Sequence, residues 1–105
     1  MGRGPREKPD RLAEKLLTIR QMLGLSQTEM LKRLRVEDRM AYHRISEFES
    51  GKGEPSLLIL LRYARVAGVH MEALVDDKLD LPETLPASVN HQEIRRKYIP
   101  RRKKH

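Results

Sequence analysis

The chain of 105 residues contains no cysteine, no tryptophan and only one phenylalanine. Without cysteine it can form neither a disulfide nor a thiolate metal site, which fits a reducing cytoplasm. With so few aromatic side chains, the core must be built from leucine, isoleucine, valine and methionine. The length suffices for one small domain with tails and is too short for two domains with separate cores.

Long apolar runs are missing too. No stretch approaches the roughly 20 apolar residues that span a bilayer, and no apolar segment of signal-peptide length follows the charged start MGRGPREKPD. We therefore expect a cytoplasmic protein that is not associated with a membrane. His70, His91 and His105 have no partners at metal-ligand spacing, and no serine lies in a nucleophile elbow. We expect no metal, no cofactor and no catalysis.

The positive charge is concentrated at one end of the chain. The formal net charge is +7, and residues 93–105 hold seven lysines and arginines against one glutamate, a net of +6. The other 92 residues carry a net of only +1, so the high isoelectric point mostly describes this tail. The tail is either a nucleic-acid-binding arm or a solubilising terminus, and the basic N-terminal arm, residues 1–10, raises the same alternatives more weakly.

Helical periodicity and capping signals predict an all-α domain over residues 11–77. The first helix, about 11–23, has apolar residues at helical spacing and stops at Gly24. Ser26 and Glu29 form the capping-box pattern, so the second helix begins at Gln27 and continues to about Leu34. The third helix is expected at about 40–50, with Asp38 as its N-cap. Its inward residues would be Ala41, Ile45 and Phe48, and its end would be Gly51.

Two further helices complete the predicted domain. The fourth begins after Ser56 and ends at Gly68, and the fifth covers about 71–76. Residues 78–105 are expected to be an extended, proline-containing segment and a mobile basic tail, with at most a short helix near 91–99. The inward positions of the two helices would be Leu57, Leu58, Leu60, Leu61, Ala64 and Ala67 in the fourth, and Leu74 and Val75 in the fifth.

Several short motifs in this order carry a resemblance to a known family. They are Arg20 with LGLSQ at 23–27, ISEFESGK at 45–52, Pro55-Ser56, and LL at 60–61 followed by Ala64, AGV at 67–69 and Leu74. Over about 11–76 the chain resembles the Cro/repressor-type helix-turn-helix regulators, also called the xenobiotic-response-element family. The resemblance implies a compact five-helix lambda-repressor-like domain whose second and third helices bind DNA.

The resemblance also implies roles for individual residues. In this family the third helix enters the major groove, and the second lies across the backbone. A partly buried ion pair between Arg20 and Glu49 would hold the first helix to the end of the third. From the residues alone, Glu47 is either a base reader or a solvated acid, and Tyr42 and His43 either contact DNA or pack on the surface. The implied base-reading residues are Ala41, Tyr42, His43 and Glu47, and the implied phosphate contacts are Gln27, Thr28, Arg39, Arg44 and Lys52.

One departure from the family pattern lies between the second and third helices. The spacing from Ser26 to Glu49 is about four residues longer than is common, and the usual glycine of the turn is missing. We place the additional residues at about 35–39, as a longer turn or as an extra turn of the second helix.

These observations predict a sequence-specific regulator that binds double-stranded DNA, with repression as the expected effect. Such a regulator would be of prokaryotic type, cytoplasmic and associated with the nucleoid when bound to DNA. One short domain contacts too few base pairs to be selective alone, so a homodimer is expected. Two alternatives stay open. The chain could be an antitoxin-like module that binds a protein partner through residues 78–105 as well as DNA, or it could bind nucleic acid non-specifically through its tail.

Overall fold

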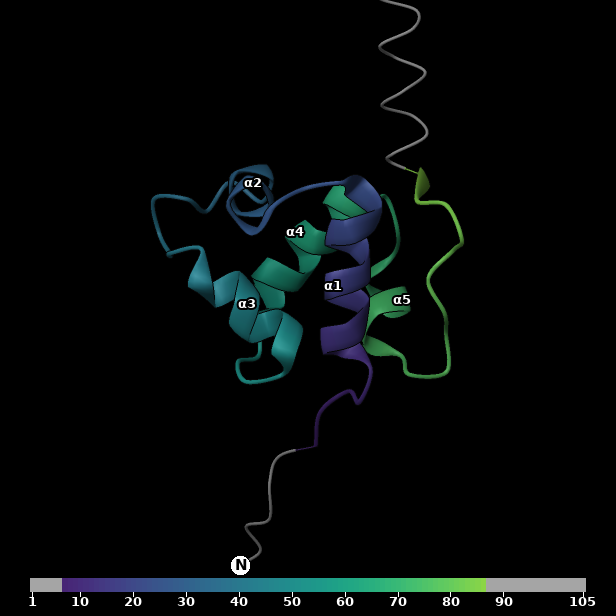
Figure 1. Cartoon of the computed structure of the whole chain (residues 1–105). Helices are drawn as coiled ribbons and strands as arrows, with labels where there is room; N and C mark the ends of the chain where they lie inside the picture. The colour runs from purple at the N-terminus through teal and green to yellow at the C-terminus, as the bar shows by residue number, and fades with distance from the viewer. Residues whose placement is uncertain (1–6, 87–105) are drawn as a thin grey trace, which may run out of the picture.

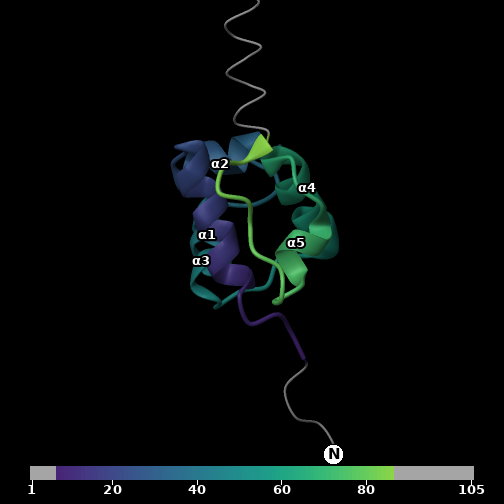
Figure 2. The same cartoon turned by 90° about the vertical axis from the view of Figure 1, so that its right-hand side faces the viewer.

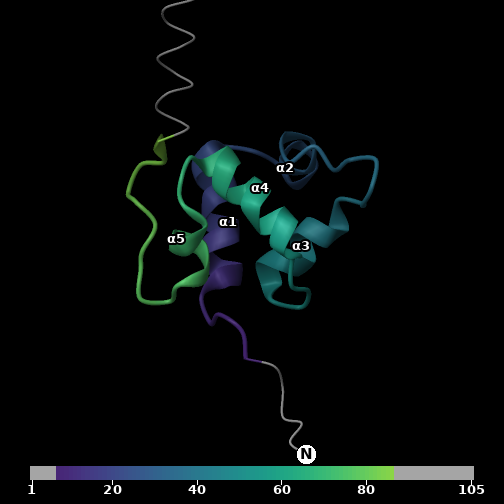
Figure 3. The same ribbon diagram turned by 180° about the vertical axis from the view of Figure 1, so that it is seen from behind.

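The computed structural model describes residues 7–86, which form five helices and no strand (Figure 1). Helix α1 contacts α3, α4 and α5, while α2 packs against α3. Figure 2 shows α3 and α4 toward opposite edges of the molecule, and Figure 3 shows α4 in front when the molecule is seen from behind. The helices are α1 (Leu12–Leu23), α2 (Gln27–Arg33), α3 (His43–Ser50), α4 (Leu57–Ala67) and α5 (Met71–Val75).

The core is aliphatic, as the composition requires, and the predicted all-α five-helix fold is confirmed. None of the described helices is long and apolar enough to cross a membrane. Tyr63 and Phe48 are the only aromatic side chains among the buried hydrophobic residues of the described part. The remaining hydrophobic side chains of the core that are less than 2% exposed are Leu16, Ile19, Met30, Leu34, Val36, Ile45, Ala67, Leu74 and Leu85.

The helix ends follow the local chemistry of the sequence. Ser26 accepts a hydrogen bond from the backbone N–H of Glu29, whose carboxylate accepts one from the N–H of Ser26, so the predicted capping box is confirmed. Ser56 caps α4 by accepting from the N–H of Ile59. The helices α1, α3 and α4 each end at a glycine in the left-handed region, which is open to glycine without steric cost.

The start of the third helix was predicted wrongly. Helix α3 begins at His43 rather than at about 40, and Asp38 is not its N-cap. Ala41 precedes the helix and is exposed, so it is not an inward position. The reason is Val36, which is only 1% exposed and accepts backbone hydrogen bonds from the N–H groups of Arg39 and Met40. The additional residues of the connection therefore form a turn anchored on a buried valine.

Three predicted core positions are also wrong. Leu57 and Leu58 are 71% and 69% exposed, because they occupy the first turn of α4 and the buried face of that helix begins only at Ile59. Val75 is 37% exposed, since the five-residue helix α5 buries Leu74 and turns its last residue outward. The first turn of α4 therefore presents adjacent leucines on the surface.

Arg35 ends α2 in an unusual conformation. Its φ is 63°, and it is the only non-glycine residue with positive φ in the described part of the chain. The N–H of Arg35 bonds the carbonyl of Lys32, and the N–H of Val36 bonds that of Leu31. This is the Schellman pattern, in which glycine normally occupies the left-handed position. An arginine here is strained, because its Cβ approaches the following carbonyl.

Replacing Arg35 by glycine is expected to stabilise the domain by about 0.5–1 kcal/mol. The relief of left-handed strain, on the order of 1–2 kcal/mol, exceeds the larger backbone entropy that glycine loses on folding. Urea denaturation of Arg35→Gly against the parent checks this difference. An Arg35→Ala variant is the control, since it removes the same charge and side chain but keeps the strain. An equal shift of both midpoints would contradict the strain argument.

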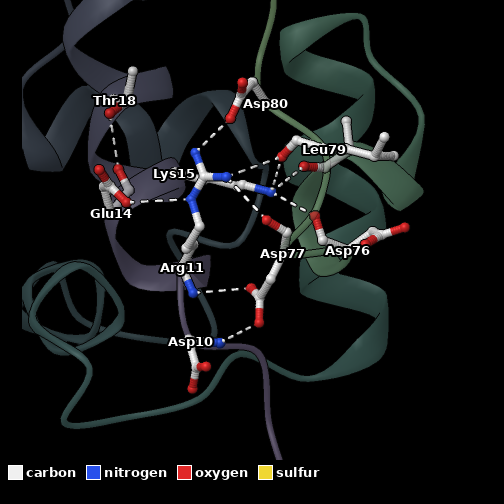
Figure 4. Close-up of polar contacts among 10 residues, drawn as sticks. Asp10, Arg11, Glu14, Lys15, Thr18, Asp76, Asp77, Leu79 and Asp80 are labelled. Atoms are coloured by element: carbon white, nitrogen blue, oxygen red, sulfur yellow. Dashed lines mark hydrogen bonds and ion pairs between the residues drawn. The ribbon is translucent and has the colours of Figure 1, made fainter.

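The segment that follows α5 packs along α1 and belongs to the domain (Figure 4). Residues 79–85 form neither helix nor strand and contain a bend at 83–84, and Leu85 is 1% exposed. The Asp77 carboxylate accepts hydrogen bonds from the backbone N–H groups of Asp10 and Arg11 at 2.9 and 3.0 Å, and thus caps the start of α1 from a distant part of the chain. The predicted tail, the short helix near 91–99 and residues 1–6 of the N-terminal arm lie outside the described residues.

Lys15 is the centre of this arrangement. It is 2% exposed, and its Nζ donates to the carbonyl oxygens of Ala73, Asp76 and Leu79 at 2.8, 2.9 and 2.7 Å. The ammonium group has three donor hydrogens, so its hydrogen-bonding capacity is filled. Burial lowers the pKa of Lys15, with the nearby Arg11 charge as a smaller cause. We call Lys15 and these three carbonyls the lysine clasp.

Asp77 should make the stability of the domain depend on pH. Its two backbone hydrogen bonds hold the pKa of the carboxyl below its ordinary value of 3.8. The stabilisation is therefore complete above the unfolded pKa and is lost as the pH falls through the folded one. Urea midpoints of the parent and of Asp77→Asn should differ most near neutral pH and converge below pH 3.8. A constant difference between pH 7 and pH 2 would contradict the capping role.

Candidate nucleic-acid interface

One face of α3 carries polar side chains and turns away from the core. Ile45 and Phe48 anchor the opposite face at 0% and 2% exposure. The outward positions repeat at the spacing i, i+3, i+4 and i+7, which places them in one row on the helix. This row consists of His43, Ser46, Glu47 and Ser50, of which only Glu47 is partly buried. Sequence reasoning missed Ser46 and Ser50, although the helical spacing from His43 points to both.

The carboxylate of Glu47 has a charged partner on the same helix. Arg44, one turn earlier, forms an ion pair with it at 2.5 Å between Nη1 and Oε1, and the Arg44 guanidinium lies 5.2 Å from the centre of the Phe48 ring. The carbonyl of Glu47 accepts backbone hydrogen bonds from Lys52 and Gly53. A Cβ on Gly53 would lie 3.3 Å from the Cβ of Glu47, so the following loop packs closely over the pair. The acid on this face is therefore largely neutralised.

The start of α3 gathers three of the predicted base readers. Ala41 is exposed just before the helix, Tyr42 is at the N-cap position and 57% exposed, and His43 is the first helical residue. The rings of Tyr42 and His43 meet edge to face, with 6.3 Å between their centres. The start of α3 follows the connection from α2 (Figure 1), and all three residues are exposed there.

The predicted phosphate contacts lie at the start of α2 and on either side of α3 in the chain. Gln27 and Thr28 are in the first turn of α2, and Thr28 is exposed. The amide of Gln27 lies 3.4 Å from a carboxylate oxygen of Glu49 and is half-buried. Arg39 is exposed in the connection before α3, while Lys52 is exposed directly after it. Donors therefore lie on both flanks of the outward row of α3.

Arg20 and Glu49 form a bidentate ion pair between α1 and α3. The distances are 2.6 Å from Nε to Oε2 and 3.0 Å from Nη2 to Oε1, and the Glu49 side chain is only 6% exposed. Arg20 also donates to the carbonyl of Leu25, just before α2. The hydrogen bond that Arg20 donates to Glu49 raises the pKa of Arg20. This one guanidinium thus links three elements and fixes the position of α2 relative to α3.

Comparison with known families agrees with this arrangement. A family model described as helix-turn-helix matches residues 16–74, more than half of the chain. The searches of curated proteins and of solved structures found no match to the chain. The matched residues include α2, α3 and the Arg20–Glu49 ion pair. Within the lysine clasp, Lys15 precedes the matched range, whereas Asp76 and Leu79 follow it. The chain belongs to the Cro/repressor-type helix-turn-helix family of DNA-binding transcriptional regulators.

Proposed function

We propose that the protein is a sequence-specific repressor that reads the major groove of double-stranded DNA with α3. The observation that carries this proposal is the outward row of α3, which is polar and solvent-facing while its other face is fixed in the core. Major-groove recognition needs such a helix, because base edges are distinguished by side-chain donors and acceptors. Tyr42, His43, Ser46 and Glu47 are the proposed base-reading side chains, and Ala41 is placed to contact a thymine methyl group.

The phosphate contacts would fix the register of α3 in the groove. Gln27 and Thr28 lie at the N-terminus of α2, where backbone N–H groups favour an anion. Arg39 and Lys52 extend the positive charge to either side of α3, whereas Arg44 is bound to Glu47 and would have to leave it to reach a phosphate. Glu47 and Arg44 therefore act together, as one acceptor and donor unit next to the bases.

A homodimer is the proposed binding form, because two half-sites supply the selectivity that one small domain lacks. Exposed apolar side chains at Val75 and Leu79 lie at the end of α5 and in the segment after it, and this region is the proposed dimer interface. The exposed pair Leu57 and Leu58 favours a protein contact at α4. An antitoxin-like function stays the second candidate, and that pair is the observation that favours it.

Selection of bound DNA from a random pool tests the role of α3. The parent should select a defined motif, and the variant with Tyr42→Ala, His43→Ala and Glu47→Ala should lose or change it at several base pairs. Each good side-chain contact to a base contributes about 1–3 kcal/mol of discrimination. A Thr28→Ala variant is the matched control, since a phosphate contact should alter affinity but not the motif. If the triple variant selects the parental motif, α3 does not read the bases.

A further inference from the structure

A shallow hollow beside α4 is lined by four arginines. It lies between the end of α2 and the outer surface of α4, and none of its lining residues is acidic. Within residues 7–86, no ion pair involves Arg33, Arg35 or Arg65. The lining residues are Arg33, Leu34, Arg35, Arg62, Arg65 and Val66, and we call this feature the arginine hollow.

Two arginines of the hollow have constrained positions, one through hydrogen bonds and one through its strained backbone. Arg62 donates from Nη1 to the carbonyls of Leu34 and Arg35 at 2.9 and 3.1 Å, which fixes its guanidinium across the end of α2. Arg35 occupies the left-handed position at which glycine would be unstrained. Retaining a side chain there lowers stability, so the strain points to a use for that side chain.

The charge of the hollow is not a general property of the domain. Residues 7–86 contain 13 lysines and arginines and 14 aspartates and glutamates, a net charge of −1. Four guanidinium groups that line one hollow without an acid therefore mark a local concentration of positive charge. Arginine, with its planar set of donors, is the side chain best suited to phosphate oxygens.

The hollow does not belong to the interface formed by α3. It lies at the end of α2 remote from Gln27, and α3 and α4 occupy opposite edges of the molecule in Figure 2. A straight duplex read by the outward row of α3 would leave the hollow on the other side of the domain. Any ligand of the hollow is thus a separate segment or a separate molecule.

We propose that the arginine hollow binds the phosphodiester backbone of a nucleic-acid segment other than the one read by α3. That segment could be flanking DNA that bends back or a second duplex, and both offer the same phosphate chemistry. The inference rests on the proposed binding of DNA through α3, which supplies the first contact. The hollow then allows one protein to hold two stretches of nucleic acid.

A bridging experiment tests the proposal. The duplex selected by the parent is tethered to beads and loaded with full-length protein, and retention of a labelled duplex of unrelated sequence is measured. The parent should retain the second duplex, and Arg33→Gln with Arg65→Gln should reduce retention about tenfold or more. Loss of two phosphate contacts should also lower the slope of log affinity against log salt for that duplex by about 1.8. Lys78→Glu, which changes the net charge equally but is not among the residues that line the hollow, is the matched control.

The outcomes separate the sources and the alternatives. If the second duplex is not retained, but affinity for a tethered site with longer flanks depends on Arg33 and Arg65, the hollow binds flanking DNA. If the double variant behaves like Lys78→Glu in both assays, the proposal is wrong. It is also wrong if the double variant changes only self-association in sedimentation, because the hollow then binds protein. Failure of the parent to select any motif would instead overturn the proposed function.

Arg35→Gly gives a second, independent readout. It should weaken retention of the second duplex although it makes the domain more resistant to urea. A variant that is more stable and retains the duplex like the parent would show that the Arg35 side chain is not used in the hollow.

Discussion

Replacing Lys15 by alanine is expected to lower the free energy of unfolding by about 3 kcal/mol. This is a large effect for a lysine, a residue type that usually lies on the surface. The substitution leaves the carbonyls of Ala73, Asp76 and Leu79 without their donor and opens a cavity under the segment that follows α5. A partly buried carbonyl without a partner costs about 1 kcal/mol or more, and an unfilled side-chain volume adds to this. Desolvation of the ammonium, which lowers its pKa, offsets part of the loss.

Urea denaturation of three variants divides this loss into its causes. Lys15→Met keeps most of the buried volume but supplies no donor, so it should lose about 2 kcal/mol through the carbonyls alone. Gln21→Ala, at an exposed position of α1, is the control for helix propensity and should change little. Amide hydrogen exchange in residues 76–86 should accelerate in Lys15→Ala. Stability like that of the parent in both Lys15 variants would show that the clasp does not hold this segment.

The sequence predicted those helix ends that depend on neighbouring residues. The Ser26 capping box, the Ser56 cap and the terminal glycines act within one turn of the chain, so their patterns are visible without the fold. The prediction of where the third helix begins was wrong, because that start depends on a tertiary contact. Val36 lies in the polar stretch RVEDRM, and only its burial shows that the chain turns there before α3 begins.

Long-range polar contacts could not be predicted in the same way. Lys15 lies at an apolar position of the α1 pattern, between Leu12 and Ile19, but its acceptors are backbone carbonyls about 60 residues away. No residue type signals a backbone acceptor. Leu57 illustrates the opposite error, because periodicity gives the apolar face of a helix but not how far along the helix that face is covered.

Some features of the candidate site could likewise be predicted from the sequence, and others only from the structure. The position of Lys52 follows from the predicted helix end at Gly51, whereas the start of the helix at Tyr42 and His43 did not follow from the sequence. The pairing of Arg44 with Glu47 is an i, i+3 contact that helical spacing allows, but only the structure shows that Arg44 takes this partner. It changes the interpretation of the acid on α3, since a carboxylate neutralised by arginine repels phosphate less than a free one does.

Glu49→Ala is expected to lower the free energy of unfolding by about 3 kcal/mol, and Arg20→Ala by a similar amount. Each change removes one partner of a pair whose side chains are 6% and 17% exposed, and so leaves the other charge buried without compensation. The loss should also reduce DNA binding, because the same guanidinium holds the Leu25 carbonyl ahead of α2. Urea denaturation and binding to the selected DNA measure the two effects separately.

A double-mutant cycle identifies the pair as the cause. The variant with both alanines should be little less stable than either single variant, because no uncompensated charge remains. Replacing the pair by Arg20→Met and Glu49→Leu should recover much of the stability, since burying two charges costs desolvation that apolar side chains avoid. The recovered domain should still bind DNA less tightly, because methionine cannot hold the Leu25 carbonyl. Additive losses in the cycle would mean that Arg20 and Glu49 act independently, and the pair would then not be what fixes α2 against α3.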